Sequence, residues 1–221
     1  RAAQQIKPEL VTLLDSAPDM VEAINILRRQ HGEPDMPHDT MRAHVSKGAR
    51  AMIGAAFGHL DADAREALVK PFLDAYEGIL GRHCVLFDGI ADMLDALEVD
   101  GVRWGIVTNK PEYLAKQLMP ILGWSERCVV LIGGDSLPER KPHPLPLLHS
   151  AEVIGVAARD CVYVGDDERD IVAARAAGLK EILHRHADLS LDAADGLLQG
   201  RGEQRVRGID ADGILQLVVG I

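Results

Sequence analysis

One segment of the chain, Cys161-Val162-Tyr163-Val164-Gly165-Asp166-Asp167-Glu168-Arg169-Asp170, passes directly from apolar, β-prone residues into a glycine and a cluster of carboxylates. The residues that follow, 171–177, have helical spacing and end at Gly178. The pattern predicts a strand that turns tightly into a helix, with the carboxylates in the turn. In a parallel α/β sheet, such turns form the ligand crevice at the carboxyl ends of the strands.

The same alternation of strand and helix extends to both sides of this segment. Strands are predicted over 104–107, 129–132, 161–164 and 181–183, and helices over 90–97, 111–122, 144–154 and up to 177. Strands separated by helices of this length form βαβ units, so we expect an α/β fold with a Rossmann-like parallel sheet as its core.

A helical block interrupts this alternation. A helix opens at Pro18 and ends near His31, and from about residue 39 to Gly81 only helical patterns occur, with Asp61 as the N-cap of one helix. Pro71 lies inside the last helical pattern and is expected to kink or break it. We therefore expect two domains, a core formed by 1–17 with 87–221 and an all-helical insertion over 18–86.

The composition limits the partners and the compartment. The 221 residues carry a formal net charge of −10, without long runs of one sign, so neither nucleic acid nor an anionic membrane is an expected partner. The three cysteines form no C-x-x-C pair, which is typical of reduced thiols in a cytoplasm. No apolar run approaches the roughly 20 residues of a membrane span, and no signal-peptide pattern is found. We expect a soluble cytoplasmic protein that acts on a small molecule.

The first of three polar loops is Val107-Thr108-Asn109-Lys110-Pro111. Thr108 follows a strand and Pro111 suits the first turn of the next helix, so a hydroxyl and free backbone N–H groups would converge at a positive helix terminus. That combination binds phosphate. The alternative is a plain Thr or Asn N-cap, which this loop alone would favour.

The second loop runs from Gly133-Gly134-Asp135-Ser136 to Arg140-Lys141-Pro142-His143-Pro144. The prolines stiffen the backbone, and they hold Lys141 just ahead of a helix. A fixed ammonium at this place could neutralise charge on a transferring phosphoryl group. A solvated lysine is the alternative, and it would be preferred if Lys141 were considered alone.

The third loop is the carboxylate turn. Asp166, Asp167 and Asp170 would repel one another unless a cation offset their charge, and hard oxygen ligands suit Mg²⁺. In the alternative interpretation Asp167 and Asp170 cap the following helix, while Asp166 points into the crevice. A phosphate loop, a fixed lysine and a carboxylate turn on successive strands form a specific set.

This set resembles the haloacid dehalogenase-like hydrolases, whose later motifs are a strand-end Thr, a Lys before a helix and a Gly-Asp carboxylate turn. The resemblance covers nearly all of 18–178. The amino-acid sequences of the first two loops resemble those of the phosphoglycolate phosphatase group. Two segments, Ser46-Lys47-Gly48-Ala49-Arg50-Ala51-Met52 and 164–171, look closer still to bacterial N-acetylmuramic acid 6-phosphate phosphatases.

The resemblance implies a function and roles for individual residues. It implies a Mg²⁺-dependent phosphatase that hydrolyses a small phosphomonoester through an aspartyl-phosphate intermediate, with the helical insertion as its cap. By this resemblance, Thr108 with Asn109 binds phosphate, and Lys141 steadies the nucleophile and the phosphoryl group. Asp166 binds the metal, with Asp170 and Asp167 beside it. In the cap, Lys47 and Arg50 contact the substrate.

The first motif of the family, a strand ending in Asp-x-Asp-Gly-Thr, is not found in this sequence. Family members carry it just before a segment that resembles 13–19, where this chain passes from Thr12 directly to Leu13. Either a short segment is missing there or the chain has lost its nucleophile, and we favour the first because loss of the central strand would break the sheet. A substitute nucleophile could be Asp15, but Ala17 stands where the acid would be. Asp88 is better explained as a helix cap.

Two functional hypotheses follow from these observations. The first is the Mg²⁺-dependent phosphatase, acting on N-acetylmuramic acid 6-phosphate or 2-phosphoglycolate. The alternative is a catalytically inactive protein that binds a phosphate ligand and lacks the nucleophile motif.

Overall fold

The computed structural model describes residues 13–165, 167–183 and 216–220. By its internal contacts the chain divides into two compact units, 1–14 with 86–221 and 15–85.

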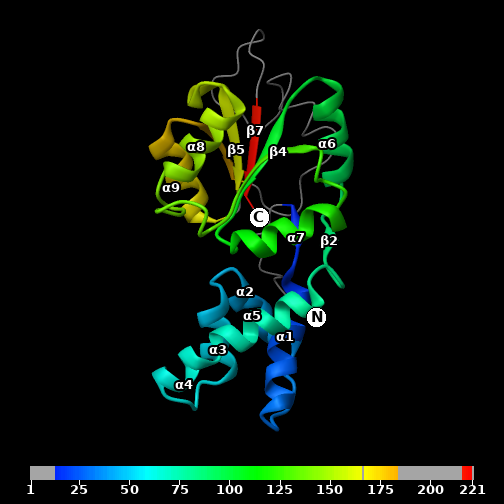
Figure 1. The fold of residues 1–221 in the computed structure, drawn as a ribbon, viewed down its shortest axis with the longest axis vertical. Helices are drawn as coiled ribbons and strands as arrows, with labels where there is room; N and C mark the ends of the chain where they lie inside the picture. Colours follow the sequence, from blue (N-terminus) through cyan, green and yellow to red (C-terminus); the bar gives the residue numbers. More distant parts are fainter. Residues whose placement is uncertain (1–12, 166, 184–215, 221) are drawn as a thin grey trace, which may run out of the picture. The chain divides into compact units, whose positions relative to one another are not determined.

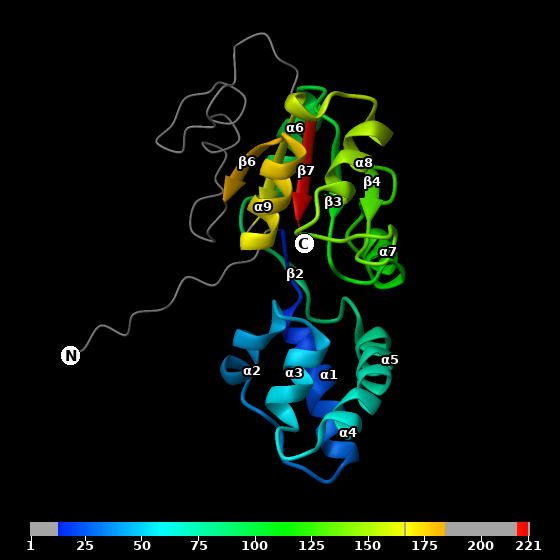
Figure 2. The same cartoon turned by 90° about the vertical axis from the view of Figure 1, so that its left-hand side faces the viewer.

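The larger unit is built on a five-stranded sheet with the strand order β4-β3-β7-β5-β6, whose labelled strands can be followed in Figures 1 and 2 together. All of the ladders in this sheet are parallel. The strands are β3 (Trp104–Val107), β4 (Cys128–Ile132), β5 (Cys161–Gly165), β6 (Lys180–Leu183) and β7 (Gln216–Gly220). The parallel sheet predicted from the alternation of elements is therefore confirmed.

Helices connect the strands of this unit and cover its sheet. In the views of Figures 1 and 2, α8 and α9 lie on one face of the sheet and α6 on the other. The helices are α6 (Ile90–Val99), α7 (Glu112–Ile121), α8 (Leu145–Ile154), the short 3₁₀ helix η1 (Ala158–Asp160) and α9 (Glu168–Ala177). Helix α9 ends at Gly178 with a left-handed φ of 73°, as the glycine stop signal predicts.

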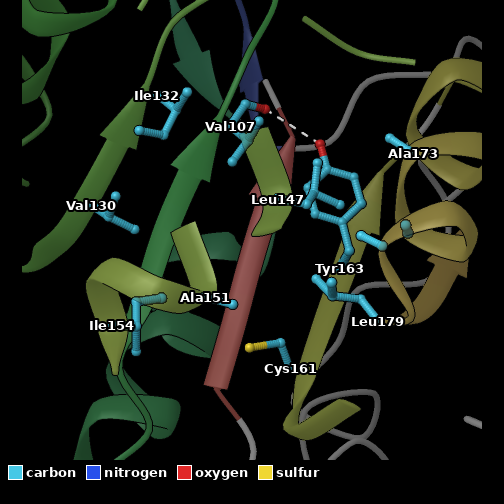
Figure 3. Close-up of a cluster of buried hydrophobic side chains, with 12 residues drawn as sticks. Val107, Val130, Ile132, Leu147, Ala151, Ile154, Cys161, Tyr163, Ala173 and Leu179 are labelled. Atoms are coloured by element: carbon cyan, nitrogen blue, oxygen red, sulfur yellow. Dashed lines mark hydrogen bonds between the residues drawn. The ribbon is translucent and has the colours of Figure 1, made fainter. Parts of the chain in front are cut away.

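A buried apolar cluster packs α8 and α9 onto the sheet (Figure 3). Its members come from β3, β4 and β5, from both helices and from the turn after α9. They are Val107, Val130, Ile132, Leu147, Ala151, Ile154, Cys161, Tyr163, Ala173, Ala174, Ala177 and Leu179. Small alanines on α9 let this helix approach the sheet closely. This packing fixes the loops at the carboxyl ends of β3, β4 and β5.

The centre of the sheet differs from our expectation. The strand between β3 and β5 is β7, which forms parallel ladders with both neighbours, so that Val107 is opposite Gly220. The described part of the N-terminal segment forms only β1 (Leu14–Asp15), which pairs with β2 (Val85–Leu86) in a separate two-stranded sheet. The argument that the sheet requires the strand before Leu13 is therefore wrong, because β7 supplies the backbone partners that β3 and β5 need.

The smaller unit, 15–85, contains only helices besides its share of β1 and β2. These are α1 (Ala17–Gln30), α2 (His38–Val45), α3 (Ala49–Ala56), α4 (Ala62–Ala67) and α5 (Val69–Ile79). The Asp61 carboxylate accepts the backbone N–H of Ala64 at 2.8 Å and caps α4, as predicted. The expected break occurs at Leu68, so that Pro71 lies in the first turn of α5. No helix in the described ranges is long and apolar enough to cross a membrane.

Candidate active site

Lys141 lies at the centre of a buried polar network at the carboxyl ends of β3 and β5. Its Nζ is 2.9 Å from the carbonyl oxygen of Val107, 2.8 Å from the hydroxyl of Tyr163 and 2.7 Å from Oδ1 of Asp170. The side chains of Lys141 and Asp170 are only 6% and 4% exposed. The network joins the loop after β4 to the end of β3, to β5 and to the first turn of α9, so the solvated lysine considered as an alternative is excluded.

Asp170 reaches this network because the strand before it ends in glycine. A Cβ built on Gly165 would lie 2.3 Å from the Cβ of Asp170 and 2.7 Å from its Oδ2. The Asp170 side chain therefore lies directly over Gly165, and only a residue without a side chain leaves that space.

Asp167 and Asp170 together cap α9. The Asp167 carboxylate accepts the backbone N–H of Arg169 at 2.9 Å, and Asp170 Oδ2 accepts the backbone N–H of Asp167 at 3.1 Å, which completes a capping box. Burial acts to raise the pKa of Asp167, but hydrogen bonds from the side chain and backbone of Arg169 outweigh it, so the pKa lies below its ordinary value. The capping interpretation of these two residues is confirmed.

The described residues do not form a magnesium site by themselves. No group of three or more His, Cys, Asp or Glu side chains in the described ranges is placed to hold a metal ion. Asp167 is bound by the guanidinium of Arg169, and Asp170 by the ammonium of Lys141. Asp166, the first metal ligand implied by the resemblance, lies outside the described residues.

The loop after β4 packs directly on the loop after β3, and two glycines permit the contact. A Cβ on Gly133 would lie 2.4 Å from the Cα of Glu112, and a Cβ on Gly134 would lie 2.3 Å from the carbonyl oxygen of Asn109. The Gly134 N–H donates to the carbonyl of Lys110 at 2.8 Å. Gly133 and Gly134 of the second polar loop thus allow its backbone to approach the backbone of the loop after β3.

The backbone N–H groups expected to be free for phosphate are bound within the protein. The N–H of Lys110 donates to Oγ1 of Thr108 at 3.0 Å, and the N–H of Glu112 donates to Oδ1 of Asp135 at 2.7 Å. Thr108 itself is 2% exposed and lies directly after β3. A phosphate bound to these two N–H groups would have to replace Thr108 Oγ1 and Asp135 Oδ1 as their hydrogen-bond acceptors.

Asn109 holds the lysine loop. Its Nδ2 donates to the backbone carbonyl of Lys141 at 3.0 Å, while its Oδ1 is buried and, among the described residues, has no hydrogen-bond partner. The free atom is an acceptor, and a phosphate oxyanion is an acceptor too. In this conformation Asn109 therefore orients Lys141, and contact with phosphate would require its amide to turn over.

The two expected substrate contacts of the helical unit are on and beside α3. The Arg50 guanidinium forms hydrogen bonds of 2.8 and 2.6 Å with both carboxylate oxygens of Glu66 on α4. Both partners are exposed, and the hydrogen bond raises the pKa of Arg50 and lowers that of Glu66. Lys47 lies in the turn between α2 and α3.

Asp15, the candidate substitute nucleophile, is bound within the protein. The carboxylate of Asp15 accepts hydrogen bonds of 3.1 and 2.8 Å from Arg42 and a bond of 3.1 Å from the backbone N–H of Ala17. This carboxylate is thus held by a cation of its own unit. The N-cap of α6 is Gly89, without a side-chain cap bond, so the expectation that Asp88 caps this helix is wrong.

Two residues of the quoted segments have roles that their sequence pattern does not predict. Tyr163 is a strand residue whose hydroxyl contacts Lys141, and Asp135 is a loop residue whose carboxylate accepts the backbone N–H of Glu112 at the start of α7. The signal for Tyr163 was its spacing, because Tyr163 and Gly165 lie on the same face of β5.

Comparison with known proteins agrees with this geometry. The family model described as haloacid dehalogenase-like hydrolase matches residues 11–183. The chain is 61% identical over 171 residues to a phosphoglycolate phosphatase of Xanthomonas campestris, covering 77% of each protein. It is 41% identical over 180 residues to an N-acetylmuramic acid 6-phosphate phosphatase of Pseudomonas aeruginosa, covering 79% of this chain and 78% of that protein.

A solved structure has the same fold. The crystal structure of a predicted phosphoglycolate phosphatase from Haemophilus somnus has a TM-score of 0.67 and 26% identity, covering 82% of this chain and 86% of that one. The relatives are named as phosphatases, which are phosphoric monoester hydrolases, so the prediction of this enzyme class is confirmed. The extent of the family match and the similarity of the relatives show that the chain belongs to the haloacid dehalogenase-like hydrolases.

Proposed function

We propose that the protein hydrolyses a small phosphomonoester, 2-phosphoglycolate or N-acetylmuramic acid 6-phosphate, through an aspartyl-phosphate intermediate. The observation that carries the proposal is the buried ammonium of Lys141, held between the strand that precedes Thr108 and the carboxylate turn. A buried cation at the carboxyl ends of parallel strands suits a ligand that bears concentrated negative charge. The names of the relatives in the comparison supply the two substrate candidates.

The proposed roles follow this geometry. Lys141 stabilises the charge of the phosphoryl group, and Thr108 with Asn109 forms the neighbouring wall of the site. Asp170 and Asp167 order the turn around Asp166 rather than offering free carboxylates. In the helical unit, Lys47 and Arg50 are the proposed contacts to the remainder of the substrate.

Magnesium is proposed as the cofactor on the carboxylate chemistry of this turn and on the family resemblance. Asp166 is the residue that would hold the ion, and the ion would supply charge neutralisation for the phosphoryl oxygens. Phosphate release is therefore expected to stop when EDTA is added and to return with excess Mg²⁺. Release that is unaffected by EDTA would remove magnesium from the proposal.

The substrate is tested with purified protein whose intact mass has been measured, because a mass that matches the 221 residues is expected of the inactive phosphate-binding protein. Phosphate release is measured with each of the two candidate substrates, and Lys141→Met serves as the matched variant because it keeps length while removing the charge. We expect release from one substrate and a loss of about a hundredfold or more in Lys141→Met. Absence of release from both substrates, together with measurable binding of inorganic phosphate, would favour the inactive phosphate-binding protein.

A further inference from the structure

We propose that Tyr163 is a positioning residue that fixes the ammonium of Lys141 and the carboxylate of Asp170 relative to each other. The inference deepens the proposed function and rests on it, because it concerns how the cation of the phosphatase site is held. It starts from the hydrogen-bond capacity of the groups that meet at the ends of β3 and β5.

The ammonium of Lys141 has as many acceptors as it has protons. An ammonium carries three N–H donors, and three oxygens lie within 2.9 Å of Nζ, from Val107, Tyr163 and Asp170. Loss of any one acceptor would leave a buried donor without a partner, or would let the ammonium turn toward the remaining two. The direction of each N–H bond is therefore set by all three oxygens together.

The hydroxyl of Tyr163 acts on both members of the ion pair. It accepts from Lys141 at 2.8 Å, and its own proton is within reach of Asp170 Oδ1 at 3.1 Å and of the Val107 carbonyl at 3.3 Å. Asp170 Oδ1 carries the negative charge, so it is the stronger acceptor for this proton. Tyr163 thereby links the cation to the anion by a second route beside their direct contact.

The position of this hydroxyl is rigid because the ring beneath it is packed. Tyr163 is fully buried in the apolar cluster between β5 and the helices α8 and α9, where Figure 3 shows its hydroxyl directed toward the Val107 carbonyl. Leu147 and Ala173 belong to the same cluster. A ring held by packing cannot follow a side chain that moves, so it sets the place of Lys141 rather than adapting to it.

The backbone also directs Asp170 to this hydroxyl. Tyr163 and Gly165 alternate onto the same face of β5, and the Asp170 side chain crosses over Gly165. The carboxylate thus lies between the end of the strand and the tyrosine hydroxyl. A phenylalanine at position 163 would fill the same apolar space and remove only the hydroxyl.

The test is Tyr163→Phe in the full chain, with Tyr76→Phe as the matched control. Tyr76 is also buried, but it belongs to α5 of the helical unit. We expect kcat to fall roughly tenfold to a hundredfold in Tyr163→Phe with KM changed by less than about threefold, since a misplaced charge acts on the reaction more than on binding. Tyr76→Phe should keep both constants. An unchanged kcat in Tyr163→Phe, or an equal loss in the control, would overturn the inference.

A second measurement needs no turnover. In protein labelled with ¹⁵N-lysine, a buried ammonium with three acceptors should give a slowly exchanging N–H signal, assigned by its loss in Lys141→Arg. We expect this signal to disappear from Tyr163→Phe and to remain in Tyr76→Phe, and its persistence in Tyr163→Phe would refute the role of the hydroxyl. If the wild-type protein releases no phosphate, the proposed function fails and this signal alone decides the inference. Thermal unfolding of both variants confirms that measurements are made on folded protein.

Discussion

The side chain of Asp170 lies directly over Gly165, at a place where a Cβ would approach the Asp170 Cβ to 2.3 Å. Gly165→Ala should therefore push Asp170 away from Lys141, and we expect a loss of about 1–3 kcal/mol in the free energy of unfolding. The same change should lower phosphate release. Urea unfolding followed by circular dichroism measures the first effect.

A matched control exists in Gly78, which lies in α5 and has no atom within 4 Å of a Cβ built on it. Gly78→Ala should stabilise its helix by about 0.5–1 kcal/mol because alanine has less backbone freedom to lose. Equal effects of the two alanines would show that Asp170 tolerates a side chain beneath it.

Asp19 is expected to stabilise the helical unit. It is fully buried, and its carboxylate accepts the backbone N–H groups of Gly81 and His83 at 2.7 and 2.8 Å and the thiol of Cys84 at 3.1 Å. Asp19→Asn would turn an amide N–H toward one of these donors, so we expect a loss of about 1–3 kcal/mol or more on unfolding. Asp74→Asn, which breaks an exposed pair with Lys70, should cost at most about 0.5 kcal/mol.

The ion pair between Asp15 and Arg42 gives a prediction about the nucleophile. If Asp15 serves only to bind Arg42, then Asp15→Asn and Arg42→Met remove the same interaction and should lower phosphate release to similar extents. The double variant should then be no worse than either single one. Complete loss of activity in Asp15→Asn alone, with Arg42→Met still active, would identify Asp15 as the attacking carboxylate.

Asn109 should act mainly through the lysine loop. Asn109→Asp removes the Nδ2 donor and places a carboxylate oxygen against the Lys141 carbonyl, now 3.0 Å from Nδ2. We expect the unfolding free energy to fall by about 1–3 kcal/mol and the KM for the phosphomonoester to rise. An unchanged unfolding free energy together with an unchanged KM would contradict this role of Asn109.

The half-buried thiol of Cys128 and the buried thiol of Cys161 predict that stability depends on alkaline pH. Burial raises the pKa of Cys128 and, together with the charge of Asp160, that of Cys161, each from 9.0 to about 11. Between pH 9 and about pH 11 the folded protein keeps both thiol protons, while the unfolded chain releases them. The free energy of unfolding is therefore highest below pH 9 and falls as the pH rises toward 11. Denaturant midpoints measured from pH 8 to pH 10.5 check this, and replacement of both cysteines by alanine should flatten the profile.

Much of the fold could be predicted because it depends on local pattern. The apolar runs, the helical spacing, the start signal Asp61 and the stop signal Gly178 are properties of neighbouring residues, and the strands and helices follow them closely. The order of strands could not be predicted in the same way. Which strand fills the gap between β3 and β5 depends on hydrogen bonds between residues that are far apart in the sequence, and β7 rather than the N-terminal segment fills it.

The sequence alone determined the family, the parallel sheet and the three loops that carry polar groups, because motif spacing and apolar periodicity can be recognised without contacts. Only the tertiary structure decided what each side chain does in those loops. Asp170 binds Lys141 and also caps α9, and Asn109 holds the lysine loop. Tyr163 supplies the third hydrogen-bond acceptor of the buried Lys141 ammonium. The physical reason is that a buried donor or acceptor must find its partner in space, and its partners here come from different strands and loops.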